Sequence, residues 1–334
     1  MARTDVRIAA VVLPLLVVLP LAIREPFYRN ILVLTVLFAA LAQAWNIVSG
    51  FCGQISLGHA LYFGIGAYAS SILYSRYAVS PLVGMWAGGA LSAFVAAVIG
   101  IPCFRMKGHY FVIATIVIAE IAYLACLNWN FVGAANGVYL PTGKESFANF
   151  QFRSHLAYYY AALVLAAALW LVSLWIRDSK WGYYWRAVKD NDEAAASLGV
   201  RIFRSKVAAA ALSACATALC GTFYAQYVGY IDPDSTMTFP LSVRISLGSV
   251  LGGIGTLWGP ALGAALLTPL AELTRTYLGG SGQGIDLVIY GVLIMAVATA
   301  RPDGVGGLIQ VVWRRWLRRA SRKIPAADVS CSKS

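Results

Sequence analysis

Two ionisable side chains lie inside long apolar segments of this sequence, where a charged group is costly and needs a reason. Glu120 is expected to be the only acidic residue deep inside a predicted helix, 109–128, and His59 lies in another apolar run, 54–75. A buried carboxyl group can mark a functional site, or it can hydrogen-bond a neighbouring helix while neutral or paired. We favour the structural role for Glu120 and keep it as a candidate for a polar path.

Further polar side chains surround His59 in the same run. Gln54 and Ser56 precede it, and Tyr62 follows one turn later beside a face of small residues. Small residues let helices approach closely, and polar groups in such helices serve both packing and function. For these four residues, packing and the lining of a path for a solute therefore both stay open.

The sequence holds no recognisable enzyme site. Its three histidines lie far apart, H-E-x-x-H and C-x-x-C are absent, and no nucleophile accompanies a base. The segment GVYLPTGKE at 137–145 is similar to a phosphate-binding loop, but it is one residue too long and lacks the Ser or Thr that follows the Lys. We therefore expect no catalytic residue, no metal and no cofactor in this chain.

The composition indicates a membrane protein. Of the 334 residues, 60% are hydrophobic and 12% charged, against about 45–50% and about 25% in soluble domains. The net charge is +12, but the basic residues lie between apolar runs, as in cytoplasmic loops. This distribution argues against nucleic-acid binding, and the composition excludes a soluble enzyme, a disordered chain and a disulfide-rich secreted module.

Apolar runs account for most of the chain. A transmembrane helix needs about 20 mostly apolar residues, and the candidates are 8–23, 29–49, 54–75, 81–104, 109–128, 156–176, 206–230 and 285–300. A Gly-rich stretch, 241–273, contains Pro260 and is expected to be re-entrant or a pair of short half-helices. We therefore expect an all-α polytopic membrane protein of about 8–10 transmembrane helices.

Non-helical backbone at membrane depth must be buried in protein or line a cavity, so the 241–273 stretch belongs at the centre of the molecule. Its glycines at 252, 253 and 255 serve either helix packing or a broken-helix path. The segment ISLGSVLGGIG at 245–255 also echoes ISLGHALYFGIG at 55–66. The predicted topology runs the two in opposite directions, as inverted repeats in transporters do, with chance similarity as the alternative.

The basic loops orient the chain. Arg3 and Arg7 place the N-terminus in the cytoplasm, and the basic loop 177–206 then falls on the same side. The tail 311–334 carries an Arg cluster with Trp313 and Trp316, which fits an anchor on anionic lipid at the cytoplasmic face. We expect a transmembrane domain over 1–310 followed by this tail.

The loop 177–206 is too polar to span a membrane. Asp190 or Asn191 can cap a short helix that carries Glu193 in its first turn and ends at Gly199. Helix physics alone leaves two interpretations open, a docking helix for a cytoplasmic partner and a solvated connector.

Three segments carry a family resemblance. Glu193, Ala194 and Ala195 followed by Gly199 resemble the EAA loop of ABC importer permeases. The segments GQISLGHALYFGIGAYAS at 53–70, RAVKDNDEAAASLGV at 186–200 and VLGGIGTLWGPALGA at 250–264 resemble signatures of the branched-chain amino acid ABC transporter permeases. The resemblance covers about residues 30–310 in order and is nearest to the LivM-type subunit.

The resemblance implies a permease subunit of an ATP-driven importer in the bacterial inner membrane. Its implied partners are a second permease, two cytoplasmic ATPases that bind the ATP, and a periplasmic substrate-binding protein. Asp190, Glu193, Ala194, Ala195 and Gly199 would couple to the ATPase. The alternatives are a urea or short-amide permease of the same family, a stand-alone channel or ion-coupled transporter and, more weakly, a membrane enzyme.

Overall fold

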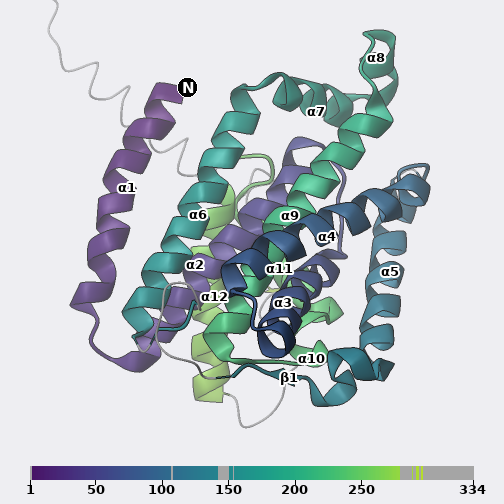
Figure 1. Cartoon of the computed structure of the whole chain (residues 1–334). Coiled ribbons are helices and arrows are strands. Elements are labelled where there is room, and N and C mark those ends of the chain that lie inside the picture. The colour runs from purple at the N-terminus through teal and green to yellow at the C-terminus, as the bar shows by residue number, and fades with distance from the viewer. Residues whose placement is uncertain are drawn as a thin grey trace, which may run out of the picture.

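The computed structural model describes residues 2–106, 108–141, 150–152 and 154–278, together with 288, 291, 292 and 295. It is a bundle of helices that run between two ends (Figure 1). The N-terminus of α1 lies at the same end as α7 and α8, while α10 and the strands lie at the opposite end. We name these the α7–α8 end and the strand end.

Most helices follow one another with short connections, and the longest, 129–154, joins α5 to α6. Their bounds are α1 Ala2–Ala22, α2 Pro26–Asn46, α3 His59–Tyr77, α4 Pro81–Cys103, α5 His109–Asn128, α6 His155–Asp178, α7 Lys180–Asp190, α8 Asp192–Ser197, α9 Ile202–Val228, α10 Pro233–Thr236, α11 Phe239–Gly252 and α12 Gly259–Leu278. A π-helical turn, η1 Ile47–Phe51, continues α2, and two 3₁₀ turns, η2 Asn130–Val132 and η3 Ala134–Asn136, follow α5.

The described sheet is minimal. The strands β1 Val138–Tyr139 and β2 Tyr230–Ile231 pair antiparallel, with Val138 opposite Ile231.

The prediction of an all-α polytopic membrane protein is confirmed. Within the described residues, five helices are long and apolar enough to cross a membrane: α2 with η1, α4, α5, α6 and α9. The predicted run 285–300 lies almost entirely outside the described residues.

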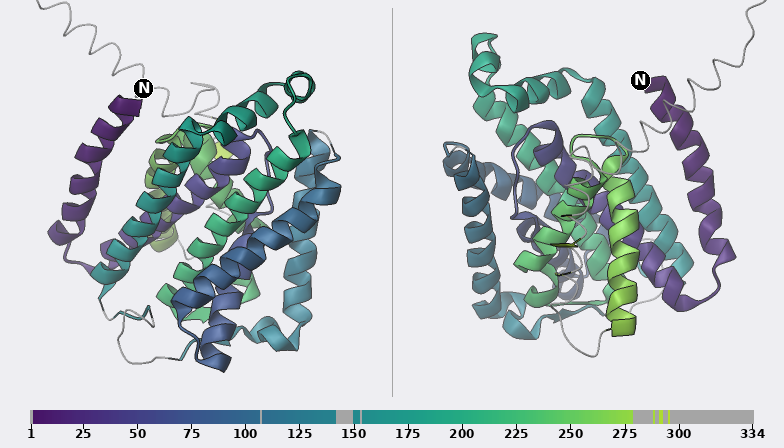
Figure 2. Two further views of the ribbon diagram at one scale, coloured as in Figure 1. Left: turned by 45° about the horizontal axis from the view of Figure 1, so that its top comes forward. Right: turned by 180° about the vertical axis from the view of Figure 1, so that it is seen from behind.

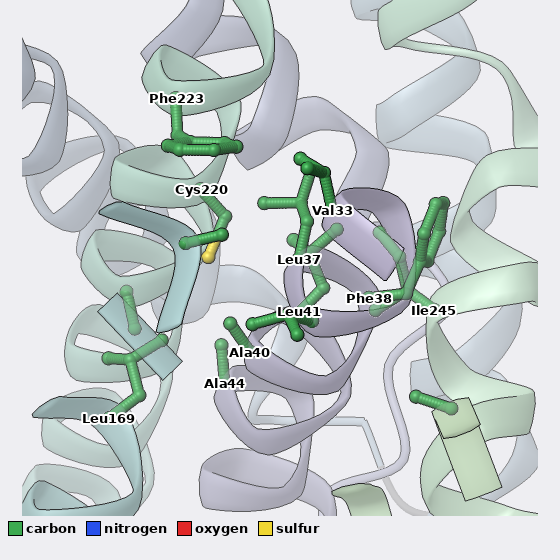
Figure 3. Packing of buried hydrophobic residues seen from close by; sticks show 14 of the residues in the cluster. Val33, Leu37, Phe38, Ala40, Leu41, Ala44, Leu169, Cys220, Phe223 and Ile245 are labelled. Carbon is green, nitrogen blue, oxygen red and sulfur yellow. The ribbon is translucent and has the colours of Figure 1, made fainter. Parts of the chain in front are cut away.

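Helix α2 forms the centre of the bundle. In its apolar window 78% of the residues are buried, against 22% in α5 and 28% in α4. Figure 3 shows α2 between Phe223 and Cys220 of α9 on one side and Ile245 of α11 on the other. A helix that is apolar all round belongs in a core, whereas α4 and α5 turn large apolar side chains such as Trp86 outward.

The predicted run 54–75 is wrong at its start. Helix α3 begins only at His59, and residues 52–58 are non-helical. Gly53 has φ +74°, a left-handed conformation that suits glycine. Side chains also satisfy this backbone from outside: Trp45 Nε1 donates to the carbonyl oxygen of Ser56 at 2.7 Å, and the N–H of Leu57 donates to Thr115 Oγ1 at 3.2 Å.

The Gly-rich stretch 241–273 forms two packed helices. Helices α11 and α12 are joined by residues 253–258, where Gly253 has φ +118° and Gly255 has φ +78°. The joint lies towards the α7–α8 end, beside Gly50 and Lys189. Helix α12 then runs back to the strand end (Figures 1 and 2). Of the two predicted forms, the structure has the pair of helices, folded as a hairpin.

Candidate coupling surface and translocation path

The chain between α6 and α9 folds into two short helices at the α7–α8 end. Asn191 lies between them, and its Oδ1 accepts hydrogen bonds from the N–H groups of Glu193 at 2.9 Å and Ala194 at 3.1 Å. A side-chain oxygen in this position is an N-cap. Of the two predicted capping residues, Asn191 therefore begins α8, and Asp190 is the exposed last residue of α7.

Gly199 ends this helical segment through its backbone conformation. Its φ is +84°, its N–H donates to the carbonyl oxygen of Ala196 at 2.9 Å, and the N–H of Val200 donates to that of Ala195 at 3.0 Å. A Cβ at Gly199 would meet no neighbour within 4 Å. The left-handed conformation alone therefore favours glycine here.

Helix α8 is anchored on one side and open on the other. Ala195 is 2% exposed, and Asp192 pairs with Lys206 of α9 at 2.5 Å. Glu193 and Ala194 are exposed, and Leu198 is 83% exposed. The helix thus presents a firmly held surface at the edge of the molecule (Figure 1).

A groove of about 610 Å³ separates this surface from the connection between α4 and α5. Both acidic and basic side chains line it: Arg105, Lys189, Asp190, Asp192, Glu193 and Lys206. Gln54, a predicted path residue, lies in its wall. The groove therefore has charged side chains in its wall and lies at the α7–α8 end of the molecule.

The other predicted residues around His59 lie deeper. Ser213 has one hydroxyl proton, which it donates to the carbonyl oxygen of Ala44 at 2.7 Å. The Ser213 hydroxyl therefore accepts from His59 Nε2 at 2.9 Å. The Tyr62 ring meets the imidazole edge-on at 5.8 Å. His59 is thus bound into a hydrogen-bonded contact between α2, α3 and α9.

Ser56, His59 and Tyr62 also line a small cavity of about 20 Å³. Such a volume holds about one water molecule. Phe104 lines both this cavity and the groove, and its ring stacks on that of Phe111 at 5.2 Å. The structure therefore brings these three predicted residues together around one small cavity and places Gln54 on the groove side of Phe104.

Glu120 lies apart from this group. It is exposed on α5 and lines neither the cavity nor the groove. One turn later, Tyr123 Oη donates to Asp234 Oδ1 of α10 at 2.6 Å. Glu120 thus stands on the outward face of a loosely packed helix.

Two of the three glycines predicted for the centre make close backbone contacts, and the third ends α11. A Cβ at Gly252 would overlap the carbonyl oxygen of Gly259, and a Cβ at Gly255 would come within 2.9 Å of that of Gly50. Gly253 takes the sharp turn that ends α11. None of the three lines the cavity or the groove described above.

An interior ion pair was not predicted from the sequence. Arg244 of α11 and Glu272 of α12 meet at 3.0 Å, both side chains being largely buried, and the guanidinium lies 4.0 Å from the Phe38 ring centroid. The expectation that Glu120 is the only acidic residue deep inside a predicted helix is therefore wrong. The sequence did contain a signal for this pair: one basic and one acidic residue lie within the apolar stretch 241–273, and charged residues inside a membrane usually pair with one another.

The fold and the distribution of charge define an all-helical integral membrane protein with a polar loop surface at one end. The sequence profile of the family described as branched-chain amino acid transport system / permease component matches residues 27–298. The chain belongs to this family.

Its curated relatives are transport permeases. The chain is 28% identical over 320 residues to the high-affinity branched-chain amino acid transport system permease protein LivM of Escherichia coli, covering 87% of this chain and 74% of that one. It is 24% identical over 298 residues to the probable LivM of Methanocaldococcus jannaschii, covering 80% and 86%. It is 25% identical over 293 residues to LivH of Salmonella typhimurium, covering 82% and 92%. No solved structure matches the chain.

Proposed function

We propose that this chain is a permease subunit of an ATP-driven importer for branched-chain and other hydrophobic amino acids. The observation that carries the proposal is the exposed helix α8, with Glu193 in its first turn and Gly199 just after its end, in a chain of the branched-chain permease family. LivM and LivH relatives support pairing with a second permease. The other partners would be two ATPases, which bind the ATP, and a periplasmic binding protein.

The α7–α8 end would face the cytoplasm of a bacterial inner membrane. Basic residues gather there, including Lys180, Arg186 and Arg201, as the positive-inside rule requires. The N-terminus lies at the same end (Figure 1). The basic tail 311–334, outside the described residues, would also lie in the cytoplasm.

Alternating access would follow from docking of α8 on an ATPase. The helix is held to α9 by Asp192 and Lys206, so a pull on α8 would reach the membrane-spanning helices directly. The small cavity around His59 and the larger groove would then be two parts of a path that opens in turn, with Phe104 between them. The mostly apolar lining of the cavity would suit an apolar side chain, and the charged lining of the groove would suit the two charged groups of a zwitterion.

The test is co-purification of the detergent-solubilised chain with its partners. We expect a second permease and ATPase subunits to be recovered with the wild-type chain and the ATPases to be lost with Glu193→Ala. Glu25→Ala removes an exposed carboxylate at the strand end and is the matched control, which should retain them. Recovery of the chain alone, active by itself, would instead support a channel or ion-coupled transporter.

The substrate is tested by competition. Leucine, isoleucine and valine should compete for uptake, while urea and acetamide should not. Competition by urea alone would favour the urea permease of the same family.

A further inference from the structure

A series of polar contacts joins α7 to the joint of the α11–α12 hairpin through the end of α2. Its first contact lies at the groove, where Lys189 Nζ of α7 donates to the carbonyl oxygen of Gly50 at 2.9 Å. Gly50 belongs to the π-helical turn η1. Such turns are rare and occur frequently at functional sites.

The second contact is made by Asn46, which is fully buried at the end of α2. Its Oδ1 accepts from the N–H of Gly255 at 2.8 Å, and its Nδ2 donates to the carbonyl oxygen of Thr256 at 2.9 Å. Both groups belong to the non-helical joint 253–258. The Asn46 side-chain amide therefore hydrogen-bonds two backbone groups of the joint that lie outside any helix. Backbone N–H and carbonyl groups away from water need such partners.

Glycines bring these groups into direct contact. A Cβ at Gly50 would overlap the Asn46 side chain and lie 2.7 Å from the backbone nitrogen of Gly255. A Cβ at Gly255 would in turn lie 3.1 Å from Lys189 Nζ. The series is therefore compact, and it consists of Lys189, Gly50, Asn46 and Gly255. Between α7 and the joint, the only long, flexible side chain in it is that of Lys189.

The hairpin beyond this contact is itself braced. Arg244 and Glu272 join α11 to α12 at 3.0 Å, and Gly263 packs against the backbone of Gly248. A displacement delivered at Gly255 would therefore move α11 and α12 together. Coupling between distant sites is carried by contiguous hydrogen bonds and packed elements of this kind.

We propose that the contact of Lys189, Gly50, Asn46 and Gly255 transmits the displacement of α7 and α8 to the α11–α12 hairpin, with Asn46 as the positioning residue. The inference rests on the proposed function and adds the route by which movement at the ATPase surface reaches the membrane interior. Asn46 and Lys189 then set how much transport follows from each ATP hydrolysed.

The experiment uses the complete transporter in proteoliposomes and measures radiolabelled leucine imported per ATP hydrolysed. Asn46→Ala and Lys189→Met should lower this ratio about two- to thirtyfold, the range of coupling effects transmitted through such contacts, while ATP hydrolysis persists. Lys189→Arg keeps a donor and should restore most of the ratio. Gln43→Leu, one turn earlier in α2 and also buried, should leave it unchanged, since the Gln43 amide nitrogen has no hydrogen-bond partner among the described residues.

The double variant provides a second criterion. If both residues act in one route, Asn46→Ala combined with Lys189→Met should lower the ratio no further than the stronger single variant. A wild-type ratio in Lys189→Met would overturn the route, and this variant of an exposed residue keeps the test available if Asn46→Ala fails to insert. Absence of ATP-driven import in the wild-type transporter would instead overturn the proposed function.

Discussion

The segments 55–58 and 245–248 both read Ile-Ser-Leu-Gly, yet they have different structures. The first is non-helical and ends at Gly58, where α3 begins. The second lies inside α11, and the chain breaks only after Gly252. Identical residues therefore precede a helix in one place and form part of a helix in the other.

The two segments nevertheless share a neighbour. Trp45 Nε1 donates to the carbonyl oxygen of Ser56 at 2.7 Å, and Ser249 Oγ donates to that of Ala42 at 2.6 Å. The last two turns of α2 thus hold both. The comparison teaches that the same four residues adopt two backbone conformations against one central helix, so the local sequence alone does not set the conformation.

Gly252, the last residue of the helix that contains the second segment, should tolerate the least change. Gly252→Val places side-chain atoms on the carbonyl oxygen of Gly259, so α11 and α12 have to separate. We expect a loss of about 3 kcal/mol or more in unfolding free energy, measured by SDS-induced unfolding in mixed micelles. Gly291→Val, at a glycine where a Cβ would meet none of the described atoms within 4 Å, is the control. Equal stability of the two variants would contradict the described hairpin contact.

The ion pair lies next to the second segment, because Arg244 directly precedes it in α11. Glu272→Leu leaves the Arg244 guanidinium largely buried and without its carboxylate. Removing one partner of a buried pair costs about 3 kcal/mol, so unfolding should shift to clearly lower SDS. The double variant Arg244→Met with Glu272→Leu removes both charges and should recover much of the loss. A double variant less stable than Glu272→Leu would argue against pairing.

The two equivalent glycines provide the direct comparison. A Cβ at Gly58 would lie 2.6 Å from the carbonyl oxygen of Thr115, whereas one at Gly248 would lie 3.1 Å from the Ala42 methyl group. Backbone yields less than a methyl contact, so Gly58→Ala should cost about 2 kcal/mol and Gly248→Ala about 1 kcal/mol. Thermal unfolding in detergent measures which variant loses more stability. A larger loss in Gly248→Ala than in Gly58→Ala would contradict the close contact between Gly58 and the backbone of Thr115.

We expect the smallest losses of stability when the side-chain hydrogen bonds between α2 and the two segments are removed. Trp45→Phe removes the Nε1 donor from the carbonyl oxygen of Ser56 in non-helical backbone, at about 1–2 kcal/mol. Ser249→Ala removes a second donor from a helical carbonyl group and should cost about 0.5 kcal/mol. Hydrogen exchange at residues 52–58 should accelerate in Trp45→Phe alone. Equal acceleration in both variants would contradict the distinction.

Length and hydropathy were enough to predict most of the long helices. The runs 81–104, 109–128 and 206–230 correspond to α4, α5 and α9 within a few residues, because each needs only its own apolar length to form. Local chemistry also predicted the start and end of α8, since Asn191 and Gly199 act within a few residues of themselves.

Features that depend on contacts between separate segments could not be predicted from the local sequence pattern. The start of α3 depends on Trp45 and Thr115, and the joint after Gly253 depends on Asn46. The pair of Arg244 with Glu272 requires the hairpin to exist first. The candidate path was predicted from residues of three segments. Ser56, His59 and Tyr62 line the cavity and Gln54 lines the groove, whereas Glu120 and the glycines at 252, 253 and 255 line neither.

The central claim is that this chain transports only as part of an ATP-coupled complex. The most direct measurement is radiolabelled leucine uptake into proteoliposomes that contain the chain alone or the complete set of permeases, ATPases and binding protein. The account predicts uptake only from the complete set, only with ATP, and its loss with Glu193→Ala. Uptake by the chain alone in the absence of ATP would contradict it.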